Sequence, residues 1–445
     1  MASSKLCVWL NDREIGTLVP TRRGASFAYG ESVVSEMSGR PVLSLSLPVK
    51  RRAYAEGLTG AWFRGLLPEG ERLTSICRTI GCEEHDYFSI LERIGWECAG
   101  AVSIRAKDSP PPAQKGPTPL SENDLAQKLR DLPTYGGIDP LARVSLGGFQ
   151  EKLLVKADDL LIEDGKVAQA KWQEPGATTI STHILKPQPK TRYPGIIEGE
   201  AWAMTCASAA ARCAHIGLLH LAGAPLTLVV ERYDRVRTHG LQVRIHQEDC
   251  CQAMGLEPSQ KYAGVDTIRG NDPTYAKIAG LLDRYAENPE EERRELLRQL
   301  VVNLALGNVD AHAKNYALLY KESAVPAVAP MYDVVPVADD VAQATFLSMR
   351  VDGVIRFEDV RREHVIGEAT HWGLSSTSAV GIVDETLERL REGLVVARGL
   401  FPQAAERHEA RALRRLTQLT RPPHEVRELP TRTRVVARQV KKAGR

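Results

Sequence analysis

The spacing of apolar residues changes near residue 238, and this change limits the folds that the chain can adopt. Residues 145–234 contain mostly short strand-like runs, with one helix predicted at 198–216 and Gly217 as its stop signal. Beyond His239 the apolar residues recur at helical spacing instead. One predicted helix carries its apolar face on Leu297, Leu300, Val301 and Leu304. The pattern predicts an α+β fold with two lobes, one rich in strands and one mainly helical.

Breaks in the pattern divide the chain further. Alternating apolar residues at 42–47 predict a half-buried strand, and a helix is expected at 71–79. Prolines within 108–117 interrupt regular structure, because proline lacks a backbone donor and fixes its own φ angle. Ser121, with Asp124 three residues later, marks a helix start. The predicted divisions are a β-rich amino-terminal subdomain at 1–107, a proline-rich linker at 108–120, a strand-rich lobe at 121–237, a mainly helical lobe at 238–431 and a basic tail at 432–445.

Composition excludes several classes of partner. Lysine and arginine total 58 against 56 acidic residues, and a net charge of +2 gives no argument for bulk attraction to nucleic acid or an anionic membrane. The apolar run at 6–10 is too short for a secretory signal, and no run reaches the ~18 apolar residues of a membrane span. The eight cysteines lack CxxC spacing, so reduced thiols are expected. We therefore expect a cytoplasmic protein without a membrane partner.

The densest set of reactive residues lies at 308–315, directly after a predicted helix. Asp310 and Asn315 are five positions apart, a spacing that lets a carboxylate orient an attacking hydroxyl while an amide oxygen holds Mg²⁺. Asp333 stands alone in the apolar, strand-like run 331–335, where an unpaired carboxylate is costly to bury. A second Mg²⁺ ligand at Asp333 would account for it. The pattern indicates phosphoryl transfer.

Phosphoryl transfer also needs positive charge and backbone donors at the nucleotide phosphates. Lys186 ends a strand-like run and is predicted to contact the phosphates, with Glu200 on the next helix as its ion-pair partner. The turn containing Gly147 and Gly148 offers backbone amides that can cap the phosphates. The apolar run at 228–234 leads into a polar connector whose backbone is expected to bind the adenine edge.

Each of these features has a simpler interpretation when it is taken alone. The glycine turn departs from both the G-x-G-x-x-G and the Walker patterns, and most lysines are merely solvated. Asp310 alone would cap a helix, and Asn315 alone would close a turn. His312 suggests a metallohydrolase, but one histidine is too few for a transition-metal site, so it is interpreted as a structural or orienting residue. The order of the features along the chain favours a kinase.

Longer motifs carry a more specific resemblance. They are Leu-Pro-Glu-Gly at 67–70, Ser-x-x-Gly-x-Gln-Glu-Lys at 145–152, Glu-Arg-Tyr-Asp-Arg at 231–235, Asp-x-His-x-Lys-Asn at 310–315 and Tyr-Asp-Val at 332–334. Together the motifs resemble those of HipA-type serine/threonine kinases, the toxin components of bacterial toxin–antitoxin systems, over nearly the whole chain. One departure is tyrosine where the family has phenylalanine in the connector. The resemblance implies a two-lobed, atypical protein-kinase-like fold with a HipA-type amino-terminal subdomain.

The resemblance also implies roles for single residues. Asp310 becomes the catalytic base, and Asn315 and Asp333 become the Mg²⁺ ligands. Ser145 becomes an autophosphorylation site, whose phosphate would displace its own loop and inactivate the enzyme. The residues expected to contact ATP are Gly147, Gly148, Gln150, Lys152, Lys186, Glu231, Tyr233, His312 and Lys314.

Partners follow from the same resemblance. The expected protein substrate is an aminoacyl-tRNA synthetase, whose modification stalls translation and growth and is associated with persistence. A small DNA-binding antitoxin is expected to neutralise the kinase, and operator DNA is expected to be bound mainly through that antitoxin. Two alternatives remain open: a small-molecule phosphotransferase, and a catalytically idle, ATP-binding corepressor partner.

Overall fold

The computed structural model describes residues 4–107, 116–132, 152–176, 179–190, 194–320, 325–340 and 345–420. Some predicted features lie outside these ranges, namely Ser145, Gly147, Gly148, Gln150, residues 108–115 of the linker and everything beyond 420, including the basic tail. All eight cysteines lie inside them; they are free thiols, as predicted, and six are buried.

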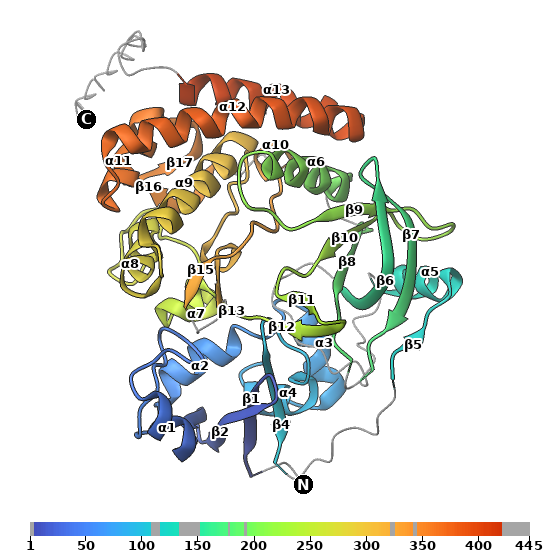
Figure 1. Cartoon of the computed structure of the whole chain (residues 1–445), viewed down its shortest axis with the longest axis vertical. Helices are drawn as coiled ribbons and strands as arrows, with labels where there is room; N and C mark the ends of the chain where they lie inside the picture. Colours follow the sequence, from blue (N-terminus) through green and yellow to red (C-terminus); the bar gives the residue numbers. More distant parts are fainter. Residues whose placement is uncertain are drawn as a thin grey trace, which may run out of the picture.

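The amino-terminal subdomain, blue in Figure 1, combines an antiparallel sheet of order β3-β2-β1-β4 with four helices. Alternate residues of β3 are buried, because one face of the sheet packs onto the core. Phe27, Trp62 and Phe63 are fully buried there, and the ring of Phe63 packs against the rings of the other two. The elements are β1 (Leu6–Leu10), β2 (Arg13–Thr21), β3 (Gly24–Tyr29), α1 (Glu31–Met37), α2 (Glu56–Arg64), α3 (Glu71–Ile80), α4 (Tyr87–Ile94) and β4 (Val102–Ala106).

The predicted strand at 42–47 is wrong, whereas the helix predicted at 71–79 is confirmed as α3. The segment 42–47 is irregular, and its serines are drawn inward together with its leucines. Ser44 Oγ donates to Glu248 Oε2 at 2.5 Å, and Ser46 Oγ donates to the carbonyl of Gln252 at 2.7 Å. The serines that alternate with apolar residues in this segment therefore form hydrogen bonds to a distant part of the chain. They do not form the solvent-facing side of a β-strand.

The strand-rich lobe is built on a six-stranded sheet of order β5-β7-β6-β8-β10-β9, and an additional β7–β9 pairing curls it toward closure. Helix α5 begins at the predicted cap, where Ser121 accepts a hydrogen bond from the backbone of Asp124. The elements are β5 (Thr118–Pro119), α5 (Glu122–Asp131), β6 (Leu153–Glu163), β7 (Lys166–Glu174), β8 (His183–Pro187), α6 (Ile196–Ser208), β9 (Ile216–Leu219) and β10 (Thr227–Glu231).

The helix predicted at 198–216 ends early, at Ser208. Backbone amides that would have continued the helix form hydrogen bonds to distant residues instead. The Arg212 amide donates to Glu295 Oε1, and the Ala214 amide donates to the carbonyl of Met331, both at 2.9 Å. Gly217 is therefore a residue of β9 and not a helix stop. Local propensity favoured a longer helix, but contacts with the second lobe decided its end.

The second lobe is mainly helical, as predicted. Its long helix α9 is capped by Asn288, ends at Gly307 with φ 75°, and buries the predicted apolar face almost completely. In Figure 1 the helices α12 and α13 lie side by side along the outer edge of this lobe. Its helices are α7 (Cys250–Met254), α8 (Tyr275–Tyr285), α9 (Pro289–Leu306), α10 (Val337–Asp340), α11 (Arg362–His371), α12 (Ser376–Leu400) and α13 (Pro402–Thr420). Its strands, with the preceding hairpin, are β11 (Arg235–Thr238), β12 (Leu241–Arg244), β13 (His246–Asp249), β14 (Ala317–Tyr320), β15 (Pro326–Val328), β16 (Phe346–Val351) and β17 (Val354–Arg356).

Two of the predicted domain limits fall within or next to β-strands. Thr118–Pro119, at the end of the predicted linker 108–120, pairs with β7 and so belongs to the sheet. The limit between 237 and 238 falls inside strand β11. The other limits stay predictions. Within the described ranges, no helix combines the length and the apolar character that crossing a membrane requires.

A buried ion cluster joins the amino-terminal subdomain to the strand-rich lobe. Glu97, in the loop between α4 and β4, lies 3.3 Å from Arg232, 3.2 Å from Arg235 and 2.7 Å from Arg244. Although burial opposes its charge, Arg235, Arg244 and Arg232 lower the pKa of Glu97 to about 2. Asp234 completes the cluster by accepting from the Gly100 amide at 2.7 Å.

A second buried carboxylate makes a similar connection. Glu248 on β13 accepts hydrogen bonds from the Ser44 hydroxyl, the Leu45 amide and the Trp62 indole of the amino-terminal subdomain. It also accepts one from Tyr320 of its own lobe. Burial raises the pKa of Glu248 to about 7 in spite of these donors. The amino-terminal subdomain is therefore fastened to both lobes by buried acceptors.

We predict that Glu97→Gln lowers the free energy of unfolding by about 3–5 kcal/mol, because it removes one of the two buried carboxylates, Glu97 and Asp234, that neutralise the arginines of the cluster. Urea unfolding at pH 7 measures the loss. In the parent protein this contribution is present above pH 4.5 and is lost as the pH falls toward about 2, because the folded-state pKa is depressed. The variant should lose less stability across that window.

Glu287→Gln is the matched control, because Glu287 is exposed in the loop between α8 and α9. It should change stability by less than about 0.5 kcal/mol. An equal, small effect of both substitutions would contradict the role assigned to the cluster.

Candidate active site

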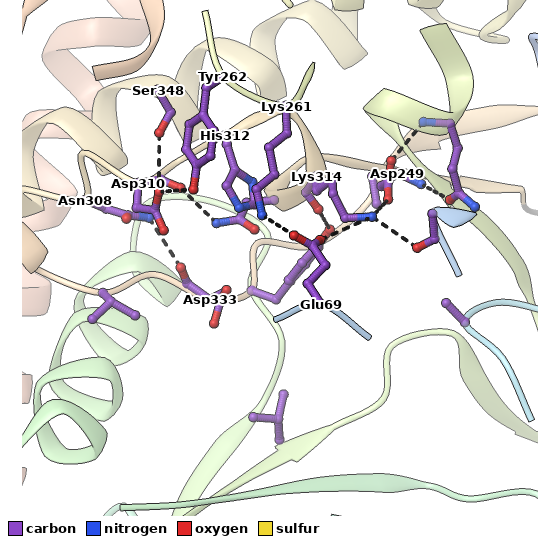
Figure 2. Close-up of a pocket in the computed structure, with 18 of the residues that line it drawn as sticks. Glu69, Asp249, Lys261, Tyr262, Asn308, Asp310, His312, Lys314, Asp333 and Ser348 are labelled. Atoms are coloured by element: carbon purple, nitrogen blue, oxygen red, sulfur yellow. Dashed lines mark hydrogen bonds and ion pairs between the residues drawn. The ribbon is translucent and has the colours of Figure 1, made fainter. Parts of the chain in front are cut away.

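A cavity of about 710 Å³ lies where the strand-rich lobe, the helical lobe and the amino-terminal subdomain meet. Strands β8 and β10 contribute Lys186, Val230 and Glu231, and the loop after α9 contributes Asn308–Asn315. Asp333 lies across from that loop, as Figure 2 shows. The cavity thus gathers predicted residues that lie far apart in the sequence.

The predicted ion pair between Lys186 and Glu200 is present and buried. Lys186 Nζ lies 2.6 Å from Glu200 Oε1 and 2.7 Å from Asp333 Oδ1, so one ammonium serves two carboxylates. Although burial opposes its charge, Asp333 and Glu200 raise the pKa of Lys186. Burial raises the pKa of Glu200, whereas Lys186 holds the pKa of Asp333 well below its usual range in spite of burial. The site therefore has a fixed positive charge at its base.

Asp333 does not lie inside a strand, contrary to prediction. In its run, Met331 alone forms an isolated bridge, with Cys213, and Asp333 has a φ of 59°. This left-handed conformation is uncommon for a residue other than glycine and is held here by its surroundings. It turns the carboxylate toward Lys186, so the cation that meets the charge in this structure is a lysine.

The loop after α9 is fixed by its own backbone bonds. The His312 amide donates to the Asp310 carbonyl at 2.7 Å, and the Asn315 amide donates to the His312 carbonyl at 2.8 Å. The Asn315 side chain closes the loop through Nδ2, which donates to the Asp310 carbonyl at 3.1 Å. No described residue donates a hydrogen bond to the Asn315 side-chain oxygen, so that oxygen is available for another partner. Burial lowers the pKa of His312 to about 3, so its imidazole is neutral.

The Asp310 carboxylate is exposed to the cavity and touches two hydroxyls that motif spacing did not predict. Tyr262 Oη donates to Asp310 Oδ1 at 3.1 Å, and Ser348 Oγ lies 3.5 Å from the same oxygen. Partial burial of Asp310 in the cavity raises its pKa, and the hydrogen bond from Tyr262 opposes the shift. Tyr262 lies between α7 and α8, Ser348 lies on β16, and the sequence motifs above include neither residue.

Two buried lysines connect the loop to the amino-terminal subdomain. Lys314 Nζ donates to the Gly65 carbonyl at 3.0 Å and to Asp249 Oδ2 at 2.9 Å. Lys261 Nζ donates to Glu69 Oε2 at 2.7 Å. The ammonium of Lys314 is thus engaged by protein oxygens, and its contact with ATP stays a prediction. Glu69 of the Leu-Pro-Glu-Gly motif thus supports the loop after α9 through Lys261.

The connector after β10 lines the opposite wall of the cavity. The Arg232 amide donates to the Thr182 carbonyl at 3.0 Å, which fixes the connector to the neighbouring strand. Tyr233 packs on Tyr332, with ring centroids 5.8 Å apart, and its hydroxyl donates to Gln247. The Glu231 side chain points to the exposed His215, 3.0 Å away. Its backbone therefore remains the predicted contact for a nucleotide base.

Lys152 follows the segment that lies outside the described residues and lines the same cavity. Burial and the nearby charge of Lys186 lower its pKa to about 8. Its carbonyl accepts a hydrogen bond from Arg72 of α3 at 3.4 Å. Two lysines, Lys152 and Lys186, therefore line the cavity where the phosphates are expected.

Comparison with known proteins agrees with this geometry. A family model described as the HipA-like C-terminal domain matches residues 144–394, and one described as the HipA N-terminal domain matches residues 6–105. The protein Y4mE of Sinorhizobium fredii, which is named as a kinase, is 36% identical over 340 residues, covering 74% of this chain and 76% of its own. The serine/threonine-protein kinase toxin HipA of Shewanella oneidensis is 28% identical over 341 residues, covering 74% of each chain.

The fold has a solved counterpart. A chain in the structure of Shewanella oneidensis HipA, HipB and their operator DNA matches with a TM-score of 0.74 at 22% identity, over 93% of this chain and 96% of that chain. This match confirms the α+β, kinase-like fold with an amino-terminal β-sheet subdomain. The two family models, the Sinorhizobium relative and the shared fold place this chain in the HipA family, and it is by homology a serine/threonine-protein kinase that uses ATP.

Proposed function

We propose that this chain is a Mg-ATP-dependent kinase that acts as the growth-inhibiting toxin of a toxin–antitoxin pair. The observation that carries the proposal is the buried contact of Lys186 with both Glu200 and Asp333, in the same cavity as Asp310 and Asn315. A small-molecule kinase would need the same chemistry, but the HipA family match over both domains favours a protein substrate.

The side chains of Asp333 and Asn315 are of the kinds that bind Mg²⁺. Carboxylate and amide oxygens, as offered by Asp333 and Asn315, are the hard donors that Mg²⁺ prefers. When bound, Mg²⁺ would neutralise charge on the phosphate oxygens. Lys186 would bind the phosphates, and the connector backbone at Glu231 would bind the adenine edge. Asp310 would orient the acceptor hydroxyl and take up its proton.

The proposal includes regulation, partners and location. Autophosphorylation at Ser145 would add negative charge to the segment that is expected to cap the ATP phosphates, and so would oppose ATP binding. We further propose an aminoacyl-tRNA synthetase as substrate, a small DNA-binding antitoxin as partner, contact with operator DNA mainly through that antitoxin, and a cytoplasmic location. The name of the Shewanella kinase and the content of the matching complex support the antitoxin and DNA partners.

We expect the phosphatase-treated protein to gain phosphate when it is incubated with Mg-ATP, as measured by intact-protein mass spectrometry. Asp310→Asn should gain none, because an amide cannot accept the proton. Ser145→Ala should gain none either if Ser145 is the modified residue. Phosphate on Ser145→Ala would contradict the site, and an unmodified parent protein would contradict autophosphorylation.

Asp333→Asn is expected to weaken Mg-dependent ADP binding by about 10- to 100-fold, the scale on which lost metal-site contacts act. Isothermal titration with and without Mg²⁺ measures this effect. Asp12→Asn, at an exposed turn of the amino-terminal subdomain, is the control and should bind like the parent. Equal Mg-dependence in the parent and in Asp333→Asn would exclude Asp333 as a metal ligand.

Induced expression of the chain in a bacterium is expected to arrest growth, whereas Asp310→Asn at the same protein level is not. Growth curves together with immunoblots provide the measurement. Arrest by both forms would contradict a toxic effect that depends on phosphoryl transfer. Growth by both forms would contradict the toxin assignment itself.

A further inference from the structure

Tyr262 makes the shortest hydrogen bond to the Asp310 carboxylate. Its hydroxyl donates to Oδ1 at 3.1 Å, and Figure 2 marks this bond with a dashed line. Ser348 is a weaker donor, because its single hydroxyl proton has a better acceptor in the Val309 carbonyl at 2.9 Å, against 3.5 Å to Asp310. Among the described residues, Asp310 Oδ2 has no hydrogen-bond partner. One carboxylate oxygen is therefore held, and the other remains for a reacting group.

Tyr262 is itself held in place, although 44% of it is exposed. Its ring meets the ring of His312 edge to face, with centroids 5.2 Å apart and an interplanar angle of 78°. The preceding residue, Lys261, is buried, bonds to Glu69 and accepts the Ala313 amide at 3.2 Å through its carbonyl. The hydroxyl is thus fixed to the catalytic loop from two sides.

The charged and titratable groups that act on Asp310 are Tyr262, Asp333 and Lys261. Lys261 is bonded to Glu69, and Asp333 repels a second carboxylate. Tyr262 alone among these side chains donates a hydrogen bond to the Asp310 carboxylate in the described part of the chain. The orientation of the carboxylate therefore depends on it.

We propose that Tyr262 is a positioning residue, which orients the Asp310 carboxylate so that Oδ2 faces the acceptor hydroxyl. This inference rests on the proposed role of Asp310 as the base. It also gives the amino-terminal subdomain a part in the reaction, because Glu69 holds the segment that carries Tyr262. Tyr262 does not exchange a proton with substrate; its effect passes through Asp310.

The test compares the autophosphorylation rate of phosphatase-treated parent, Tyr262→Phe and Asp310→Asn proteins across a range of ATP concentrations. For Tyr262→Phe, the maximal rate should fall about 5- to 50-fold, as expected for a lost hydrogen bond to a charged group that must be oriented. The ATP concentration at half-maximal rate should stay within about twofold, because the ring and the phosphate-binding residues are retained. Tyr262→Phe/Ser348→Ala should lose more, because the Ser348 hydroxyl is the remaining donor.

Tyr285→Phe is the matched control, because Tyr285 lies on α8 outside the cavity lining and should leave the rate unchanged. A normal rate for Tyr262→Phe, while Asp310→Asn is inactive, would overturn the positioning role and leave the proposed function intact. A parallel rise in the half-maximal ATP concentration or a lower unfolding midpoint would also overturn it, in favour of a structural role. Parent-level activity of Asp310→Asn, or an inactive parent, would instead overturn the proposed function, and the inference with it.

Discussion

The buried contact of Glu97 with three arginines is the interaction on which the arrangement of the active site depends. Arg232 and Arg235 belong to the connector that follows β10, so the carboxylate of one subdomain fixes the wall of the cavity formed by another. A buried ion cluster adds little net stability relative to a well-packed cluster of apolar side chains. Its charged groups are stable only when they keep their distances and hydrogen bonds, so the cluster fixes the geometry around it. The cluster therefore sets the position of the connector more than it sets the free energy of folding.

The amino-terminal subdomain contributes to the site in a second way. The Gly65 carbonyl, just after α2, accepts a hydrogen bond from Lys314, and Glu69, just before α3, accepts one from Lys261. These lysines are next in sequence to Asn315 and Tyr262. Glu248 adds a third buried connection between the same subdomain and β13. The kinase lobes and the amino-terminal subdomain thus share one set of buried polar contacts. Partial loosening of the subdomain would leave charges in the lobes buried without their partners, so the parts are expected to unfold together.

One lysine of the cavity pairs with two carboxylates at once. Lys186 is paired with Glu200 and Asp333, and the left-handed conformation of Asp333 is tolerated because this contact offsets its cost. A ligand that brings negative phosphates and a divalent cation would compete for both partners of this contact. We therefore expect nucleotide binding to rearrange the contacts of Lys186 with Glu200 and Asp333.

The sequence alone determined the parts of the site that depend on spacing. Asp310 and Asn315 lie on one short loop, and Lys186 and Glu200 lie on a strand and the following helix, so local geometry brings each pair together. The capped α9 and its apolar face were predictable for the same reason. Spacing did not predict three other features: the irregular segment 42–47, the early end of α6, and the contacts of Glu97 and Ser348. Each depends on partners more than thirty residues away in the chain, and only the tertiary structure decides which polar groups meet across that distance.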